Sequence, residues 1–518
     1  MTSELDDLHR KLTHFLNPQQ RSLYFLRDGK VLHTLEKRPS IKKNFIMNAL
    51  LSMSSVIFPL ITFPYVSRIL LPEGTGKVSF ATSLISYFSL FAQLGIPTYG
   101  IRVCAQVRDD REELTRTAQE LLLINLIMDA VSYAAMAVAL VFVPRLREDR
   151  PLYLIVSTTI LLTSIGMDWL YQAMEQYTYI TVRSVIFKFV ALIAMFLLVH
   201  RKEDYVIYGA ISIFASSASN ILNFVNAHRY IDMRPVGHYH LKRHLKPIGI
   251  FFAMSCATTI YTNLDTVMLG FITTSTDVGY YNAAVKIKGV LVSVVTSLGA
   301  VILPRASYYI EKGQTEEFRR ITARALEFAF LCATPLALYF MLFAKQSIYF
   351  LSGPAYTGSI APMILIMPTL LFIGITGITG YEILIPTGNE KIVLYSEVAG
   401  AIIDLLLNAI LIPGMKSSGA AIGTLVAEFV VFLVQYGYLR GELGRILRGI
   451  PHGKILIAIL LAAVCSFWVP NLGLGSFLTL LISALLFFGV YGGCLLALRE
   501  SMILEIWEQF RSKGKRRG

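Results

Sequence analysis

Long stretches without any charged side chain constrain the fold of this chain more than any other feature. Six of them cover residues 45–67, 78–101, 205–227, 359–381, 455–476 and 477–498. A helix crosses the hydrocarbon core of a bilayer with about 20 apolar residues, so each stretch is long enough to span a membrane. Eight more stretches carry one or two charges each: 121–143, 151–174, 176–200, 247–271, 278–304, 325–344, 392–415 and 417–439. The sequence therefore predicts fourteen transmembrane helices.

The fold class follows from how backbone groups behave in lipid. They must form hydrogen bonds within their own segment, which makes each spanning stretch helical. The strands of a transmembrane barrel alternate with period two, and these continuous apolar runs do not. Charged residues make up 16% of the chain, against about 25% in soluble domains. We therefore expect an all-α polytopic membrane protein, whose net charge of +13 favours a membrane surface rather than nucleic acid.

The distribution of lysine and arginine predicts how the chain is oriented. An even number of spans puts both termini on the same side. With the N-terminus in the cytoplasm, the cytoplasmic segments hold 34 of the 47 lysines and arginines, and the outer loops hold 8. Cytoplasmic loops carry the excess of positive charge in membrane proteins. We therefore expect a multi-pass protein of a bacterial cytoplasmic membrane, with both termini cytoplasmic. The outer loop 145–150 departs from this pattern with three arginines.

Similar segments recur at a nearly constant offset. "GKVSFA" begins at Gly76 and "GYYNAA" at Gly279, and Arg102 and Arg305 each open a charged loop 203 residues apart. Six predicted spans separate the two loops, so the two copies face the same way, as in parallel transporter repeats. The pattern predicts two parallel six-helix lobes followed by two C-terminal helices. The predicted parts are an N-terminal extension (1–43), a lobe (44–228), a basic linker (229–246), a second lobe (247–440), helices 13 and 14 (455–498) and a basic tail (499–518).

Several motifs together resemble a known family. "FPYVSRILLPEGTGKVSFATSL", "FAQLGIPTYGIR", "NLDTVMLGFITTSTDVGYYNAAVKI", "LSGPAYTGSIAPMILIM" and "GAAIGTLVAEF" resemble Wzx-type oligosaccharide flippases of the MATE-like (MOP) exporter superfamily. The resemblance covers about residues 41–500. It implies two lobes around a central cavity that opens alternately to each side. It also implies a substrate, an oligosaccharide carried on undecaprenyl diphosphate, moved outward for capsule, exopolysaccharide or O-antigen synthesis, with a polysaccharide polymerase as a partner.

Three other functions compete with this one. Cation-coupled MATE-type multidrug exporters tend to carry an acidic residue in the first span, and residues 44–67 have none. Peptidoglycan lipid-precursor flippases usually have more arginine early in the chain. A membrane glycosyltransferase or polymerase needs a catalytic acid or a large loop, and the longest predicted outer loop is short. The sequence has no GxxxxGK[ST] phosphate loop, HExxH or CxxC motif, so we expect a transporter without a metal or cofactor.

The implied diphosphate would need cations, because a buried anion must be paired. Charges inside spans usually face a cavity. The candidates for binding the diphosphate and sugars are Arg68, Lys188, Lys286 and Lys288. At about 100° per residue, Lys286 and Lys288 lie about 200° apart and cannot share one helix face. The alternatives are snorkelling to the interface for Arg68 and ion pairs between helices for the lysines.

Five acidic residues lie well inside the predicted spans: Asp129, Asp168, Asp265, Asp404 and Glu428. Asp265, in "NLDTVMLG", is the candidate for binding a coupling ion or proton, and pairing with a lysine is the alternative. The linker contains "HRYIDMRPVGHYHLKRHLKP", which we interpret as a basic helix on anionic lipid headgroups rather than a metal site.

Overall fold

The computed structural model describes residues 41–505, 507 and 508. Within these residues the chain is helical and contains no β-strand. Ten helices are long and apolar enough to cross a membrane, or eleven if the bent pair Pro354–Ile366 and Thr369–Leu384 is one span. The predicted N-terminal extension, apart from residues 41–43, and residues 509–518 of the predicted tail lie outside the described part of the chain.

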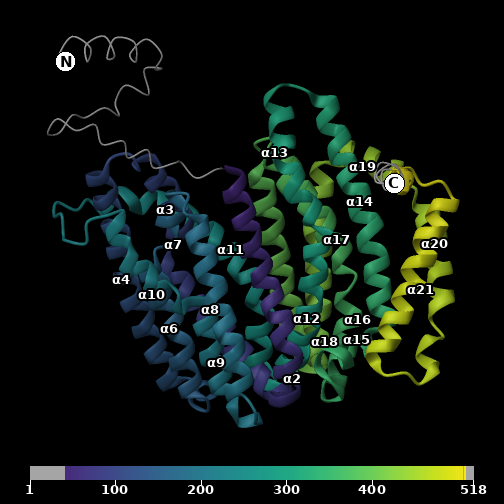
Figure 1. Cartoon of the computed structure of the whole chain (residues 1–518), viewed down its shortest axis with the longest axis horizontal. Helices are drawn as coiled ribbons and strands as arrows, with labels where there is room; N and C mark the ends of the chain where they lie inside the picture. The colour runs from purple at the N-terminus through teal and green to yellow at the C-terminus, as the bar shows by residue number, and fades with distance from the viewer. Residues whose placement is uncertain (1–40, 506, 509–518) are drawn as a thin grey trace, which may run out of the picture. The chain divides into compact units, whose positions relative to one another are not determined.

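The helices up to residue 229 are drawn purple to blue in Figure 1, where α3 to α10 gather on one side of the bundle and the purple part of α2 runs near its middle. They are α2 (Ile41–Gln93), α3 (Ile96–Gln106), α4 (Arg111–Phe142), α5 (Pro144–Arg147), α6 (Arg150–Gly166), α7 (Asp168–Ala173), α8 (Tyr177–Leu198), α9 (Tyr205–Ile213) and α10 (Asn220–Asn226). Short 3₁₀ turns lie at η2 (Lys202–Asp204) and η4 (Ala227–Arg229), and η3 (Phe214–Ala218) is π-helical.

The helices that follow run from teal to yellow in Figure 1, with α11 near the middle of the view and the later ones mostly on the other side. They are α11 (Lys242–Ile272), α12 (Ser275–Val295), α13 (Ser297–Glu311), α14 (Thr315–Leu342), α15 (Ala344–Ser352), α16 (Ile360–Ile366), α17 (Thr369–Gly377), α18 (Glu390–Tyr438), α19 (Arg440–Gly449), α20 (His452–Ser466) and α21 (Ser476–Ala497). The shorter elements are 3₁₀ η5 (Pro354–Ser359), π-helical η6 (Ile378–Leu384) and 3₁₀ η7 (Val469–Leu472). α20 and α21 pack on each other and against α14.

Two very long helices are broken near their middle. α2 leaves helical geometry at Leu71 (φ 58°, ψ 177°), directly before Pro72, and α18 does so at Lys416 (φ 50°, ψ −128°). Pro72 explains the first break, because proline lacks the N–H that would continue the helix and disfavours helical geometry in the residue before it. Both breaks fall between predicted spans, after 45–67 and after 392–415.

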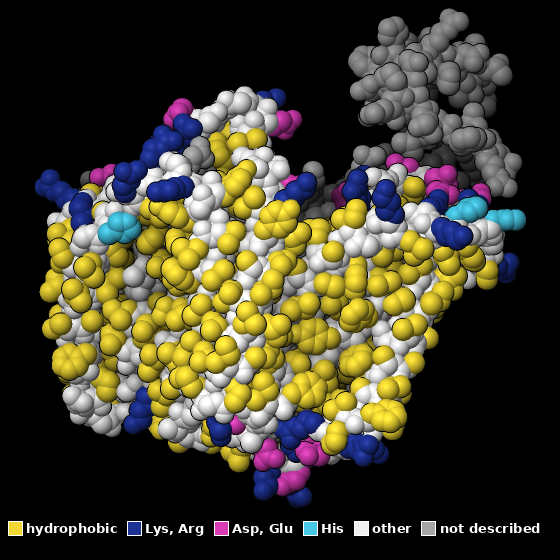
Figure 2. All heavy atoms as spheres, turned by 180° about the vertical axis from the view of Figure 1, so that it is seen from behind, with side chains coloured by type: hydrophobic (Ala, Val, Ile, Leu, Met, Phe, Trp, Pro, Cys, Tyr) yellow, Lys and Arg dark blue, Asp and Glu magenta, His cyan; other side chains and the backbone are white. Residues whose placement is uncertain are grey.

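The outside of the bundle is a broad apolar belt between two charged ends, as Figure 2 shows for one face. Phe142 is 72% exposed, Ile410 71% and Leu485 70%. Soluble monomers rarely expose apolar patches of more than a few hundred Å². The chain is therefore a multi-pass membrane protein, and the coarse fold prediction is confirmed.

The linker is not the basic helix that we expected. Residues 232–240 contain no helix, and Gly237 (φ 74°) and His238 (φ 51°) adopt left-handed backbone conformations after Pro235. The Gln119 side chain of α4 donates to the carbonyls of Asp232 and Arg234, both at 2.8 Å. The linker thus runs as an irregular segment held to α4, because turn residues and a partner helix override its local helical preference.

Candidate functional site

The two similar sequence segments that begin at Gly76 and Gly279 contact each other through main-chain atoms at one end of the bundle, which we name the Leu71 end. A Cβ atom added to Gly76 would lie 1.7 Å from the Ser275 carbonyl oxygen. One added to Gly279 would lie 2.0 Å from the Pro72 carbonyl oxygen. Both distances are far below any real contact, so only glycine allows α2 and α12 to approach this closely. The approach brings together residues from before and after the linker.

Polar side chains reinforce this closure. Arg145 donates to the Gly270 carbonyl (3.2 Å) and to the Ser275 hydroxyl (2.9 Å), and the hydroxyls of Thr75 and Tyr356 lie 2.7 Å apart. Each contact joins a residue from before the linker to one from after it. Arg145 is one of the three arginines that broke the charge pattern of the outer loops. Its role as a bridge gives it a structural reason to be there.

Arg68 lies at the same end and binds a helix terminus. Its guanidinium donates to the carbonyls of Leu351 (3.1 Å) and Phe350 (2.5 Å), in the last turn of α15. The last carbonyls of a helix lack partners within the helix and attract cations. The side chain is exposed and connects the two sides of the bundle.

The three predicted lysines have different surroundings. Lys188 of α8 donates from Nζ to the hydroxyls of Ser54 and Ser55, both at 2.9 Å. The ammonium of Lys286 stacks 4.8 Å from the ring centroid of Phe63, across the bundle on α2. Lys288 is half-buried and interacts electrostatically with Asp404 and Glu428. Among the described residues, none of the three lysines forms an ion pair within 4.0 Å with a carboxylate. The described contacts thus place each of the three lysines beside different partners.

Asp265 lies in a buried polar cluster between α11, α12 and α18. Its carboxylate accepts hydrogen bonds from the Asn408 amide (2.6 Å), the Thr424 hydroxyl (2.9 Å) and the Tyr281 hydroxyl. Asp265 is only 7% exposed and the neighbouring Asp404 2%. The hydrogen-bond donors are polar but uncharged, so the lysine partner considered as an alternative is not among the contacts of Asp265 that the structure describes.

Two oxygens of this cluster have no partner. Asp404 Oδ1 and Asn408 Oδ1 are buried without a hydrogen bond among the described residues. Both point at the same spot, since a Cβ added to Gly423 would lie 2.9 Å from the former and 2.4 Å from the latter. Carboxylate and amide oxygens are hard ligands that suit a hard cation. No group of three His, Cys, Asp or Glu side chains in residues 41–505 has the arrangement of a metal site.

Sequence reasoning found part of this cluster. Asp265 and Asp404 stand out as acids inside apolar stretches, which is a signal of function. Asn408 and Thr424 give no such signal, because neutral polar residues are common in spans. They meet Asp265 only because helices far apart in the chain pack together: Asn408 lies 143 residues after Asp265, and Thr424 lies 159 residues after it.

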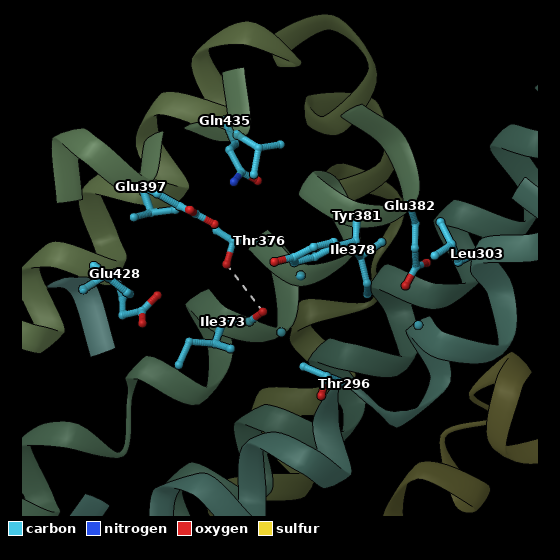
Figure 3. Close-up of a pocket in the computed structure, with 16 residues that line it drawn as sticks. Thr296, Leu303, Ile373, Thr376, Ile378, Tyr381, Glu382, Glu397, Glu428 and Gln435 are labelled. Carbon is cyan, nitrogen blue, oxygen red and sulfur yellow. Dashed lines mark hydrogen bonds between the residues drawn. The ribbon is translucent and has the colours of Figure 1, made fainter. Parts of the chain in front are cut away.

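A cavity of about 450 Å³ lies beside this cluster, between α11, α13, α17, η6 and α18. Figure 3 shows the carboxyls of Glu382, Glu397 and Glu428 around it, with Tyr381 and Thr376. No lysine or arginine lines it among the described residues. It lies wholly after the linker. A second cavity of about 420 Å³ lies between α2, α6, η3 and α11, so it is walled from both sides of the bundle.

A multi-pass bundle that closes at one end, with repeated segments meeting there and cavities within, is the architecture of a membrane transporter. The sequence family described as "Polysaccharide biosynthesis protein" matches residues 41–310, and the family described as "MatE" matches residues 251–410. The first match covers more than half of the chain. The chain belongs to the polysaccharide biosynthesis protein family, and the resemblance seen in the motifs is confirmed.

Individual relatives agree with this membership. A protein of Escherichia coli K12 named "Putative O-antigen transporter" is 23% identical over 405 residues, 78% of this chain and 97% of its own length. A solved structure of the lipid II flippase MurJ in an inward closed conformation has a TM-score of 0.69 at 16% identity, covering 89% of this chain and 100% of that one. An inward-facing MATE multidrug transporter has a TM-score of 0.57 at 15% identity, covering 78% and 99%.

At such low identity, the similarity to the two solved structures supports the fold alone. The functional class is supported by the family and by the Escherichia coli relative. The chain is a transporter and not an enzyme, as the sequence predicted, and it is a polysaccharide-biosynthesis flippase by family.

Proposed function

We propose that this chain translocates a lipid-linked oligosaccharide, carried on a polyprenyl diphosphate such as undecaprenyl diphosphate, by alternating access. One observation carries the mechanism. Repeat-related segments meet at Gly76 and Gly279 and seal the Leu71 end, while a cavity lies between helices of both sides. Separation of that contact would open the cavity to the other side of the membrane. The polar head would cross inside the protein and the polyprenyl tail would stay in lipid.

The layout that goes with this mechanism has fourteen crossings. Splitting α2 at Leu71 and α18 at Lys416 adds two spans to the apolar helices, and α11 and the bent pair supply two more. The proposed lobes are residues 44–228 and 247–440, with α20 and α21 beside the second. The linker end faces the cytoplasm in this proposal, supported by the 34 lysines and arginines of the segments predicted to lie there.

The diphosphate is proposed to meet Lys286 and Lys188. Among the described residues the partners of both amines are neutral, an aromatic ring and two serines, so no carboxylate there cancels either positive charge. Lys288 stands near acids, and Arg68 is engaged with α15, which makes them secondary candidates. A polysaccharide polymerase that receives the flipped substrate is the proposed protein partner.

The experiment that tests this assignment replaces both lysines. Lys188→Ala combined with Lys286→Ala should abolish surface polysaccharide while the protein stays in the membrane at normal amount. A hydrogen bond to a charged group contributes about 1.5–3 kcal/mol, so losing two should weaken diphosphate binding by more than tenfold. Lys345→Ala is the matched control, because that exposed lysine lies on α15 near the sealed end.

Two results would contradict the proposal. Unchanged polysaccharide in the double variant would remove the diphosphate assignment. A gain of resistance to cationic dyes in a drug-sensitive host, without any effect on polysaccharide, would identify a drug exporter instead.

The Asp265 cluster is proposed to bind the coupling ion, either a proton or a monovalent cation. The support is the pair of unpartnered oxygens on Asp404 and Asn408 beside the buried Asp265 carboxylate. Asp265→Asn should remove any dependence of transport on an imposed Na⁺ or proton gradient in vesicles. A variant that keeps the full gradient dependence would show that this cluster is only structural.

A further inference from the structure

The cavity of about 420 Å³ between the two sides of the bundle has an unusual lining. Nine of its fourteen lining residues carry a hydroxyl or an amide, and none of the fourteen, all in the described part of the chain, is charged or aromatic. Ser86 and Gln93 come from α2, Thr159 from α6, Ser216 from η3, and Thr259 and Asn263 from α11. Its volume lies in the range of small-ligand sites, about 300–1,000 Å³.

The polar groups are arranged to accept hydrogen bonds. The Ser86 hydroxyl donates to the Ser83 carbonyl (2.7 Å), which leaves its lone pairs free. Gln93 donates from Nε2 to the Ser89 hydroxyl (3.0 Å), and Asn263 donates from Nδ2 to the Thr259 carbonyl (3.1 Å). The carbonyl oxygens of both amides are left to accept from a ligand. A ligand rich in O–H donors fits this lining.

The backbone at the cavity wall is also unusual. Ser216 lies in η3, a π-helical turn inside an otherwise α-helical segment. Single π-helical turns occur frequently at functional sites, because the wider turn changes the direction of side chains. This turn contributes Ser216 to the cavity lining, and Ile213, the last residue of α9, lies directly before it and lines the cavity as well.

The absence of charge in the lining selects the ligand. A carboxylate or other anion taken into this cavity would lose water without gaining a cation, which is costly. A cation would find no carboxylate here, in contrast to the cavity lined by Glu382, Glu397 and Glu428. An uncharged polyol satisfies both conditions.

We propose that this cavity is the subsite for uncharged sugar residues, hexoses or N-acetylhexosamines, of the transported oligosaccharide, with the diphosphate bound elsewhere. The inference rests on the proposed function and deepens it, since it names the sugar class. The cavity belongs to both sides of the bundle, so sugars bound there contact the two parts that move relative to each other during transport.

The test is equilibrium binding to the full-length protein in nanodiscs with three probes. They are undecaprenyl diphosphate without sugar, the same lipid with a neutral disaccharide, and the same lipid with a disaccharide that ends in a uronic acid. The native protein should bind the neutral glycolipid about tenfold more tightly than the bare lipid, which corresponds to about 1.4 kcal/mol. The uronic acid should remove this gain.

The variants Ser86→Leu and Asn263→Leu fill the cavity from opposite walls. Each should lose the preference for the neutral glycolipid and keep the Kd for the bare diphosphate. Asn263→Lys should instead reverse the preference toward the uronic acid, a result that a merely structural role would not produce. Thr158→Leu is the matched control, because Thr158 neighbours Thr159 on α6 but its side chain is exposed.

Each outcome has a separate meaning. If the filled variants keep the neutral preference, or if the native protein prefers the uronic acid, the sugar subsite is wrong and the flippase proposal stands. If the native protein binds none of the three lipids, the proposed function fails and the subsite fails with it.

Discussion

At the scale of single residues, Gly76 and Gly279 show how a small sequence signal becomes a structural requirement. Gly76 and Gly279 both lack the left-handed backbone conformation that favours glycine, so conformational freedom does not explain why glycine stands at these two positions. The explanation is space, because a Cβ on either would overlap a carbonyl oxygen of the opposite helix. The predicted parallel repeat would place corresponding positions at the same end of the bundle, and the two glycines do meet there.

Alanine at either position should therefore keep α2 and α12 from closing against each other at the Leu71 end. Overpacking a close contact costs about 1–3 kcal/mol. We expect Gly76→Ala and Gly279→Ala to lower surface polysaccharide and to raise the labelling, by a membrane-impermeant thiol reagent, of a cysteine introduced at Thr75. Gly289→Ala on α12 is the control, because nothing lies within 4 Å of a Cβ added there. Labelling that stays equal in all three variants would show that the glycine contact does not control the seal.

Asp265 marks the limit of what single residues reveal. Its place inside an apolar stretch made it a candidate from the sequence. Its donors Asn408 and Thr424 come from a helix whose position depends on the packing of the whole second group of helices. No local pattern predicts a partner at that separation in the chain.

At the scale of elements, the spans were the most predictable part of the molecule. Transfer into lipid depends on the composition of a segment and little on its partners, so the apolar stretches predict helices directly. The breaks at Leu71 and Lys416 fall in the gaps between predicted spans. The count of fourteen crossings stays a prediction, because in the described part of the chain ten helices qualify on their own, or eleven if the bent pair is one span.

The linker is the element where local reasoning failed. Its basic residues fit an interfacial helix, but Pro235 and Gly237 begin a turn instead. Glu120 of α4, which is fully buried, then accepts from the His240 N–H (2.6 Å), Arg243 (2.8 Å) and His244 (2.7 Å). A buried carboxylate needs such partners. The conformation of this segment depends on hydrogen bonds to a helix more than a hundred residues away, and a hydropathy pattern cannot predict such bonds.

At the scale of the whole molecule, the contacts at the Leu71 end describe one of the two states that alternating access requires. Thr75 and Tyr356 touch across this end, and so do Arg145 and Ser275. Contacts across the linker boundary must break when this end opens. Contacts between residues that both precede the linker, such as that between Lys77 and Asp149 at 3.3 Å, need not change.

A covalent bridge distinguishes these two kinds of contact. In a protein whose five native cysteines are replaced, Thr75→Cys with Tyr356→Cys should, after cross-linking with a short cleavable thiol reagent, stop transport. Cleavage of the bridge should restore it. The control pair Lys77→Cys with Asp149→Cys should keep transport after cross-linking. Full transport with the first bridge intact would contradict a mechanism that opens this end.

The glycine contact has a consequence for how such proteins diversify. The closest approach at this end, at Gly76 and Gly279, joins main-chain atoms, whose chemistry is the same in every protein, whereas the cavity is lined by side chains. Mutations can therefore alter the cargo without weakening the barrier against leakage. Related proteins can therefore carry different surface sugars while they keep the same glycine contact at the closed end.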